Sequence, residues 1–132
     1  MDMKLELVMV PVTDVDRAKE FYEKVGFVVE HDHVVSDDVR FVQMTPPGSA
    51  CSIAFGKGLT KMAPGSLDNM QMVIADADAT RADLVARGIE VSDVDELAWG
   101  RFVFFADPDG NGWALQQLPD WSRSAGGEGY QA

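Results

Sequence analysis

The sequence predicts an α+β fold of two tandem βαβββ units, whose eight strands form one curved mixed sheet that encloses a cleft. The first observation is an Asp-x-Asp step ahead of a helical stretch, which occurs at Asp14 and again 62 positions later at Asp76. The second is a glycine that ends each helical stretch, Gly26 and Gly88, with the same separation. The third is the tripeptide Arg-Phe-Val, which occurs once in each copy ahead of a Pro/Gly turn and a last apolar strand. Duplicated units of this kind create a binding cleft where they meet, so the cleft is expected at their junction.

The first repeat spans about residues 4–56. Its apolar, β-branched run from 5 to 12 predicts a buried strand. A helix of about ten residues then begins at Asp14 or Asp16 and ends at Gly26, because aspartate caps helix starts and glycine caps helix ends. The apolar stripe of this helix comprises Ala18, Phe21, Tyr22 and Val25. Three further strands are expected over 27–35, 39–44 and 50–55, with Pro46-Pro47-Gly48 as a turn.

The second repeat spans about residues 69–118 and follows a linker over 56–68. A strand over 69–75 leads into a helix from about 78 to 87, whose inner stripe is Ala77, Thr80 and Leu84. Short strands are expected around 90–91, 101–106 and 112–117. The tail over 119–132 is rich in Ser, Gly and Glu, so we expect it to be mobile apart from Trp121 and Tyr130. Residues 1–132 are expected to form a single domain.

Composition excludes several classes of partner. The chain has 22 acidic and 11 basic residues, a net charge of −11, whereas nucleic acids and anionic membranes need clustered Lys and Arg. Cys51 is the single cysteine and lies in an apolar strand, which predicts a packed thiol and no disulfide. A secretory signal pattern and an apolar run of membrane-spanning length are both absent, which predicts a cytoplasmic protein.

The sequence motifs carry a family resemblance over about residues 4–118. The chain resembles the vicinal oxygen chelate superfamily in its segments 12–18, 21–22, 26–27 and 105–112, which read VTDVDRA, FY, GF and FADPDGNG. That superfamily includes glyoxalase I, extradiol dioxygenases, fosfomycin-resistance enzymes and bleomycin-resistance binding proteins. The resemblance implies the fold described above, but one scaffold hosts many chemistries, so function must come from the site residues.

The resemblance also places the four metal ligands of the superfamily's enzymes, usually His, Gln or Glu. They fall on Leu7, Ala54, Asn69 and Ala114, with Met70 as the alternative to Asn69. Leu and Ala carry no donor atom, and a neutral amide binds transition metals poorly. We therefore expect no metal and no cofactor at these positions.

Three other features have competing interpretations. His31 and His33 fall on one face of a strand and are close enough to share an ion, but exposed residues at a polar strand end are the favoured interpretation. Residues 107–112 copy the start of a calcium loop, but position twelve is Leu118, so a β-turn is favoured. Arg40 and Arg101 suggest anion binding, although the sequence does not show which face of the sheet they occupy.

Strand alternation predicts the lining of the cleft. The inward-facing positions are apolar with a few neutral amides, as in small-molecule pockets, and the alternative is that the cleft closes into ordinary core. Amides favour the pocket, because buried amides need partners. Trp99 is expected either to form a lid or stacking surface or to contribute to packing. The predicted ligand-binding residues are Leu5, Leu7, Met9, Ala54, Asn69, Gln71, Ala114, Gln116 and Trp99.

These observations favour a metal-free protein of the bleomycin-resistance type that holds an apolar or aromatic small molecule in its cleft and acts as a homodimer. The alternative is a lyase, dioxygenase or isomerase of the same superfamily with a non-standard metal site or none; no catalytic residue is assigned. A third reading is an interaction module whose dimer surface is its function. The sequence identifies neither the ligand nor whether a dimer is domain-swapped.

Overall fold

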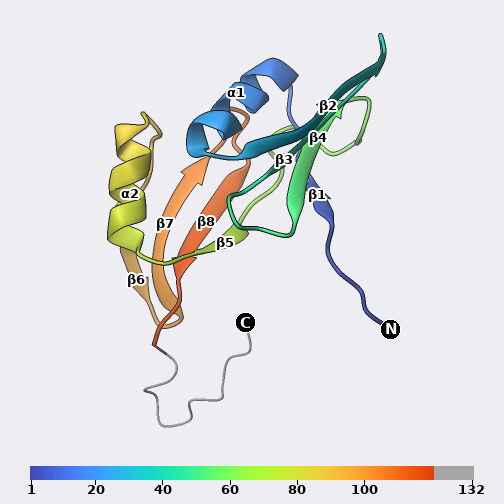
Figure 1. Ribbon diagram of the computed structural model, residues 1–132. Helices are drawn as coiled ribbons and strands as arrows, with labels where there is room; N and C mark the ends of the chain where they lie inside the picture. The colour runs from blue at the N-terminus through green and yellow to red at the C-terminus, as the bar shows by residue number, and fades with distance from the viewer. Residues whose placement is uncertain (121–132) are drawn as a thin grey trace. The chain divides into compact units, whose positions relative to one another are not determined.

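A computed structural model describes residues 1–120, and the fold it shows is α+β with two tandem units (Figure 1). The chain divides into two compact units. Unit 1 comprises residues 1–68 and 106–112, and unit 2 comprises the rest of the described chain, 69–105 and 113–120. The eight strands are shared between two four-stranded mixed sheets. The predicted mobility of the tail, and the roles considered for Trp121 and Tyr130, concern residues 121–132, which lie outside the described residues.

Unit 1 contains one helix and one sheet in the order β1-β4-β3-β2. Strands β1 and β4 pair in parallel, and the other neighbouring strands are antiparallel. The elements are β1 (Leu7–Met9), α1 (Val15–Val25), β2 (Val28–Ser36), β3 (Val39–Thr45) and β4 (Ser52–Lys57). The first strand is shorter than the predicted run over 5–12, because its pairing with β4 covers three residues and Pro11 ends the ladder.

Helix α1 follows the predicted caps and stripe. The Asp14 side chain accepts a hydrogen bond from the Arg17 backbone N–H at 3.1 Å, and Gly26 ends the helix at a φ of 120°, which favours glycine. Of the predicted stripe, Ala18 and Tyr22 are fully buried. The helix therefore packs its apolar side on the sheet of unit 1.

The core of unit 1 centres on Tyr22. Its ring lies 5.2 Å from the ring of Phe27 and 5.8 Å from that of Phe55 in β4. Its hydroxyl donates a hydrogen bond to the carboxylate of Asp107 at 2.8 Å. Asp107 lies in the β-turn that precedes the last strand, so a turn from the second repeat completes the core of the first unit.

That turn is a β-turn, as predicted, and not a calcium loop. Gly110 donates its backbone N–H to the Asp107 carbonyl, and the Asp107 carboxylate accepts from the backbone of Asp109 and Asn111. Asn111 is fully buried and donates its amide to the Pro11 carbonyl at 2.8 Å. The carboxylate of Asp107 is thus surrounded by protein donors.

Unit 2 repeats the arrangement with the sheet order β5-β8-β7-β6. Helix α2 begins after Asp76, which caps it through Ala79 N–H, and it buries Ala77 and Leu84 of the predicted stripe. The elements are β5 (Met70–Ile74), α2 (Ala77–Ala86), β6 (Asp95–Leu97), β7 (Gly100–Ala106) and β8 (Gly112–Gln117).

The predicted strand at 90–91 is wrong. The segment is joined to β7 through Ser92, whose backbone N–H donates to the Phe104 carbonyl and whose hydroxyl accepts from the Phe104 N–H. A side chain thus takes the place of the backbone acceptor that a ladder would supply, and pairing with β7 begins at Asp95 instead. Within residues 1–120, no helix is long and apolar enough to cross a membrane.

Candidate functional site

One face of the sheet in unit 1 is turned away from α1, and we call it the helix-free face of that sheet. The register places Leu7 opposite Ser52 and Met9 opposite Ala54, so these four side chains share one face. Phe55 points to the other side, toward α1. Ala54 is fully buried, whereas Leu7 and Met9 are partly exposed. The face is therefore apolar along β1 and β4.

Sequence reasoning missed residues that extend this face across β3 and β2. Gln43 lies opposite Ala54, and Phe41 lies two residues before it in β3. The buried positions of β3 alternate with them, and this period of two was the signal that would have identified them. His31 and His33 pair with Gln43 and Phe41, and their rings stack with centroids 5.6 Å apart. Both histidines are exposed, as predicted.

The helix-free face of unit 2 carries a chain of amides. Gln71 lies opposite Ala114, and Val73 lies opposite Gln116. The Gln71 amide donates to the Gln116 side-chain oxygen, and the Gln116 amide donates to the Trp99 carbonyl at 2.7 Å. Gln116 is buried at 5% exposure, so its polar atoms are satisfied inside the protein. Gln71 is exposed, so the chain of amides reaches the surface of the sheet.

Phe104 is another position that sequence reasoning missed. Its ring stacks on that of Phe102 at an interplanar angle of 7°, with the centroids 5.8 Å apart. Phe105, the next residue, stacks on Trp113 instead, and strand alternation turns its neighbours to the opposite face. Phe102 is buried, whereas Phe104 is partly exposed. Phe104 therefore offers aromatic surface on the same face as Gln71.

The remaining predicted residues lie outside the strands. Leu5 precedes β1 and is 70% exposed, and Trp99 lies between β6 and β7 with 56% exposure. Asn69 precedes β5, is exposed, and has a φ of 56°. Its backbone is thus in the left-handed region, which asparagine tolerates better than most residues. The register brings together Leu7, Met9 and Ala54 in one unit and Gln71, Ala114 and Gln116 in the other.

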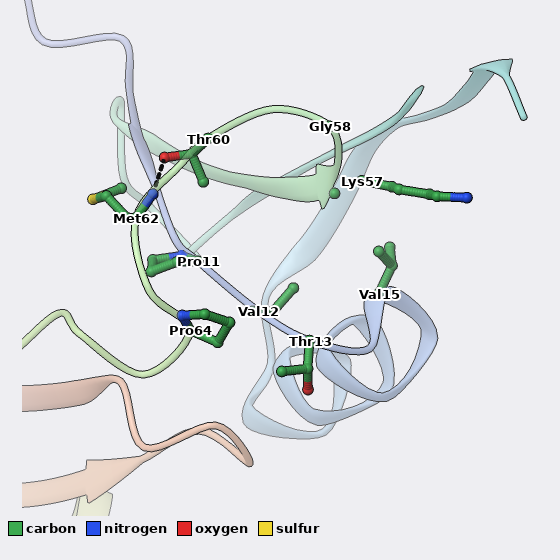
Figure 2. Close-up of a pocket in the computed structure, with 10 residues that line it drawn as sticks. Pro11, Val12, Thr13, Val15, Lys57, Gly58, Thr60, Met62 and Pro64 are labelled. Atoms are coloured by element: carbon green, nitrogen blue, oxygen red, sulfur yellow. Dashed lines mark hydrogen bonds between the residues drawn. The ribbon is translucent and has the colours of Figure 1, made fainter. Parts of the chain in front are cut away.

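A hollow of about 400 Å³ lies at the end of β4 in unit 1, where β1 leads into α1 (Figure 2). Lys57 points away from it and donates to the Asp37 carbonyl at 2.6 Å (Figure 2). The hollow lacks all nine predicted ligand-binding residues and uses the segment predicted as a linker. Its lining comprises Pro11, Val12, Thr13, Val15, Gly56, Lys57, Gly58, Thr60, Met62 and Pro64.

The comparisons with known proteins agree with this architecture. The sequence profile of the Glyoxalase/Bleomycin resistance protein/Dioxygenase superfamily matches residues 4–115. The chain belongs to this superfamily. A curated relative, an uncharacterized protein named YetH from Bacillus subtilis (strain 168), is 28% identical over 113 residues, which cover 83% of this chain and 94% of YetH.

Two solved structures from Streptomyces sp. CB03234 are similar to this superfamily member. TnmS3, described as an antibiotic binding protein, is 36% identical with a TM-score of 0.80, covering 89% of this chain and 98% of TnmS3. A glyoxalase/bleomycin resistance protein is 37% identical with a TM-score of 0.75, covering 86% of this chain and 100% of that protein. The fosfomycin resistance protein FosX from Mesorhizobium loti is 18% identical with a TM-score of 0.65, covers 90% of this chain and 94% of FosX, and shows the fold alone.

The register also tests the four positions at which the resemblance places metal ligands. Leu7 lies two residues before the partner of Ala54, and Asn69 lies two residues before the partner of Ala114. The two units thus place these positions alike, which favours Asn69 over Met70 as the equivalent of Leu7. Three of the four side chains have no donor atom, so this set does not fit a divalent metal. Residues 1–120 contain no group of three His, Cys, Asp or Glu side chains that could hold one.

Each of the two repeated arginines lies on the helix-facing side of the sheet in its own unit. Both guanidinium groups form ion pairs with carboxylates. Arg40 in β3 donates to Asp32 in β2 and to Asp16 in α1, with its shortest contact at 2.8 Å. Arg101 in β7 donates to Glu96 in β6 and to Asp78 in α2. The guanidinium groups therefore link helix to sheet, which accounts for them without a bound anion.

These ion pairs shift the pKa values of their members. Hydrogen bonds from Arg40, and next from Lys19 at 2.9 Å, lower the pKa of Asp32 to about 2. The same bond to Asp32 raises the pKa of Arg40. In unit 2, the hydrogen bond from Arg101 lowers the pKa of Asp78.

Proposed function

We propose that this superfamily member binds a small, largely apolar or aromatic molecule through the helix-free faces of its two sheets, without using a metal. The observation that carries the proposal is the set of side chains at the superfamily's metal positions, three of which have no donor atom. A protein that holds its ligand by apolar contact needs no such donors. The proposed contacts are the nine residues Leu5, Leu7, Met9, Ala54, Asn69, Gln71, Trp99, Ala114 and Gln116.

The composition of these faces supports a neutral, flat ligand. Leu7 and Met9 offer partly exposed apolar surface, and Phe104 offers part of an aromatic ring. The exposed amide of Gln71 provides a polar contact, since pockets of this kind use few polar groups to orient a mostly apolar ligand. Burying about 200 Å² of apolar ligand surface would contribute roughly 5 kcal/mol before the costs of association.

The similarity to TnmS3 supports the same class of ligand. That protein is described as antibiotic binding. It is 36% identical to this chain, and the match covers 89% of this chain. We therefore propose an antibiotic-sized molecule as the ligand and sequestration as the mode of action. Sequestration requires affinity alone, which is consistent with the absence of an assigned catalytic residue.

The proposal is tested by ligand binding to a charged variant of the proposed face. Native mass spectrometry of the protein with a panel of antibiotics, bleomycin among them, and fluorescence titration with the neutral aromatic dye Nile red provide the readouts. Leu7→Glu should weaken binding at least tenfold, because a carboxylate facing an apolar ligand loses water without gaining a partner. The fold should be retained, since Leu7 is partly exposed.

The matched control is Val85→Glu, which adds the same charge at an exposed apolar position of α2. Its binding should equal that of the wild type. If Leu7→Glu binds the dye and every antibiotic hit as well as Val85→Glu does, the ligand does not contact the proposed face.

One observation favours a second candidate, an enzyme with a displaced metal. His31 and His33 stack on the same helix-free face as Leu7. Two imidazoles supply two of the three or four donors that a transition metal needs. Elemental analysis of protein purified without chelator separates the candidates: about one metal per chain, lost in His31→Ala and His33→Ala, would favour the enzyme.

A further inference from the structure

The chain of amides in unit 2 runs in one direction. A backbone carbonyl can only accept a hydrogen bond, and the Trp99 carbonyl lies 2.7 Å from the side-chain nitrogen of Gln116. This contact orients the Gln116 amide, so its oxygen is the atom that meets Gln71, and the Gln71 amide donates to it. Gln116 is only 5% exposed. Reversing its amide would leave the Trp99 carbonyl facing another acceptor with little access to water, which is costly.

The backbone beside Gln116 holds this chain in place. Gly100 is buried, and a Cβ atom at this position would lie 2.4 Å from the Gln117 carbonyl oxygen and 3.2 Å from Cγ of Gln116. A residue without a side chain therefore lets β7 begin close against the end of β8. Trp99, the preceding residue, thereby brings its carbonyl within reach of Gln116. Figure 1 shows β5, β8 and β7 side by side in this sheet.

The free end of the chain is an acceptor on an apolar surface. A primary amide has two N–H groups and one oxygen with two lone pairs, and Gln71 gives one N–H to Gln116. Its oxygen receives no hydrogen bond from the described residues. The side chain is exposed on the helix-free face, where Ala114 lies opposite it and Val73, 59% exposed, is its neighbour in β5. A ligand on this face would cover the oxygen.

We infer that Gln71 selects a ligand that carries a hydroxyl group on its aromatic part, an inference that rests on the proposed function. A hydroxyl group donates to the free oxygen of Gln71 and accepts from its remaining N–H, so it satisfies both. A ligand without a donor would bury the oxygen unpaired, and a site built to hydrogen-bond a hydroxyl discriminates against such analogues. Gln116 acts on the ligand through Gln71 and is a positioning residue.

Gln43 on the helix-free face of unit 1 provides a contrast. It is partly exposed and lies opposite Ala54 in β4, much as Gln71 lies opposite Ala114 in β8. Its side chain makes no hydrogen bond to another described residue. The Gln43 amide can therefore rotate and present either its oxygen or its N–H to a ligand. Only a glutamine whose amide is oriented by a buried partner distinguishes a donor from an acceptor.

The experiment compares two matched probes, 2-naphthol and 2-methoxynaphthalene, as competitors of Nile red bound to the full chain at pH 7. Both probes are neutral at this pH and share the same rings, but the methyl ether has no hydrogen-bond donor. The wild type should bind 2-naphthol about three- to tenfold more tightly than the ether, which is the effect of one hydrogen bond. The measured quantity is the ratio of the two dissociation constants.

Substitutions of Gln71 should change this ratio in a defined way. Gln71→Leu should bring it close to one, because the acceptor is lost. Gln71→Glu should keep or increase it, because a carboxylate only accepts. Gln43→Leu is the matched control and should leave the ratio at the wild-type value. All three substitutions are at exposed or partly exposed positions, so circular dichroism should show unchanged folding.

Gln116→Met tests the positioning role. Gln71 keeps its amide in this variant but loses the partner that orients it, so the ratio should fall toward one. A purely structural role of Gln116 would instead weaken both probes by the same factor and leave the ratio unchanged. Without any ligand, nuclear magnetic resonance should show slower hydrogen exchange for the side-chain amide of Gln116 than for that of Gln43. Equally fast exchange would contradict the hydrogen-bonded chain.

The outcomes separate this inference from the proposed function. Equal dissociation constants for the two probes in the wild type would overturn the selection of a hydroxyl group, as would a ratio that Gln71→Leu does not change. Either result would leave the binding of Nile red, and with it the proposed function, intact. A wild type that does not bind Nile red would overturn both.

Discussion

Arg40 and Arg101 occupy equivalent places in the two units, but their surroundings differ. Arg40 is 21% exposed and its partner in the neighbouring strand, Asp32, is 23% exposed, whereas Arg101 is 33% exposed and its partner in the neighbouring strand, Glu96, is 75% exposed. The difference follows from strand length: β2 has nine residues and carries Asp32 beneath Lys19, whereas β6 has three residues. Duplication thus preserved the pattern of the ion pairs but not their protection from water.

The two helices show the same asymmetry. Tyr22 of α1 and Leu84 of α2 lie at equivalent positions, 62 residues apart, and both are buried. Leu84 needs only apolar neighbours, whereas the Tyr22 hydroxyl needs a buried acceptor, which Asp107 supplies. Unit 1 is therefore specified by a polar network as well as by packing, and we expect its stability to be the more sensitive to single polar substitutions.

The largest expected effect is that of Asp107→Ala. Asp107 is 5% exposed, and its carboxylate accepts hydrogen bonds from Tyr22, from the Asn111 side chain and from two backbone N–H groups. Removing it leaves buried donors without an acceptor, which should lower the free energy of unfolding by about 3–5 kcal/mol. Urea unfolding followed by circular dichroism measures the change.

The control for this prediction is Asp95→Ala, in the exposed strand β6 of unit 2, which should change the free energy of unfolding by less than about 0.5 kcal/mol. A similar small loss in both variants would show that the network around Tyr22 contributes little, and that the two units are equally tolerant.

The sequence predicted the features that depend on local chemistry. The Asp-x-Asp helix starts and the turn at residues 107–112 were predicted, because side-chain and backbone preferences within a few residues determine them; the structure selects Asp14 over Asp16 as the first cap and makes Asp76 the second. The fold class followed from the repeat, which needs no knowledge of contacts. Alternation along β1 and β4 likewise placed Leu7, Met9 and Ala54 on one face.

The features that the sequence could not predict depend on distant contacts. Tyr22 and Asp107 are 85 residues apart, and nothing in the stripe of α1 indicates that one of its residues needs a carboxylate. The position of β6 was missed because Ser92 replaces a backbone acceptor with its hydroxyl. The face of Arg40 depended on a register that a single sequence does not contain.

The second prediction compares the two arginines directly. Arg40→Leu should lower the free energy of unfolding by about 1–2 kcal/mol, because it leaves Asp32 with Lys19 alone in a partly buried place. Arg101→Leu should cause a clearly smaller loss, because solvent already screens Asp78 and Glu96. Equal losses, measured by urea unfolding at pH 7, would contradict the view that burial separates the two clusters.

The last expected effect is a dependence of stability on pH that is stronger in unit 1. The pKa of Asp32 is about 2 in the folded protein and near 3.9 in an unfolded chain, so its ionised form stabilises the fold above pH 4. That contribution, about 1–2 kcal/mol after allowance for partial exposure, should be lost as the pH falls from about 4 to 2.

Asp32→Asn should be less stable than the wild type at pH 6, and the difference should shrink as the pH falls through this window. Asp78→Asn, which removes the helix carboxylate that pairs with Arg101, is the comparison in unit 2 and should show a weaker dependence of the same sign, since Arg101 also lowers the pKa of Asp78 but leaves the carboxylate exposed. Urea midpoints measured between pH 6 and pH 2 distinguish these outcomes. A difference for Asp32→Asn that stays constant across the window would mean that Arg40 and Lys19 do not hold this carboxylate in its charged form.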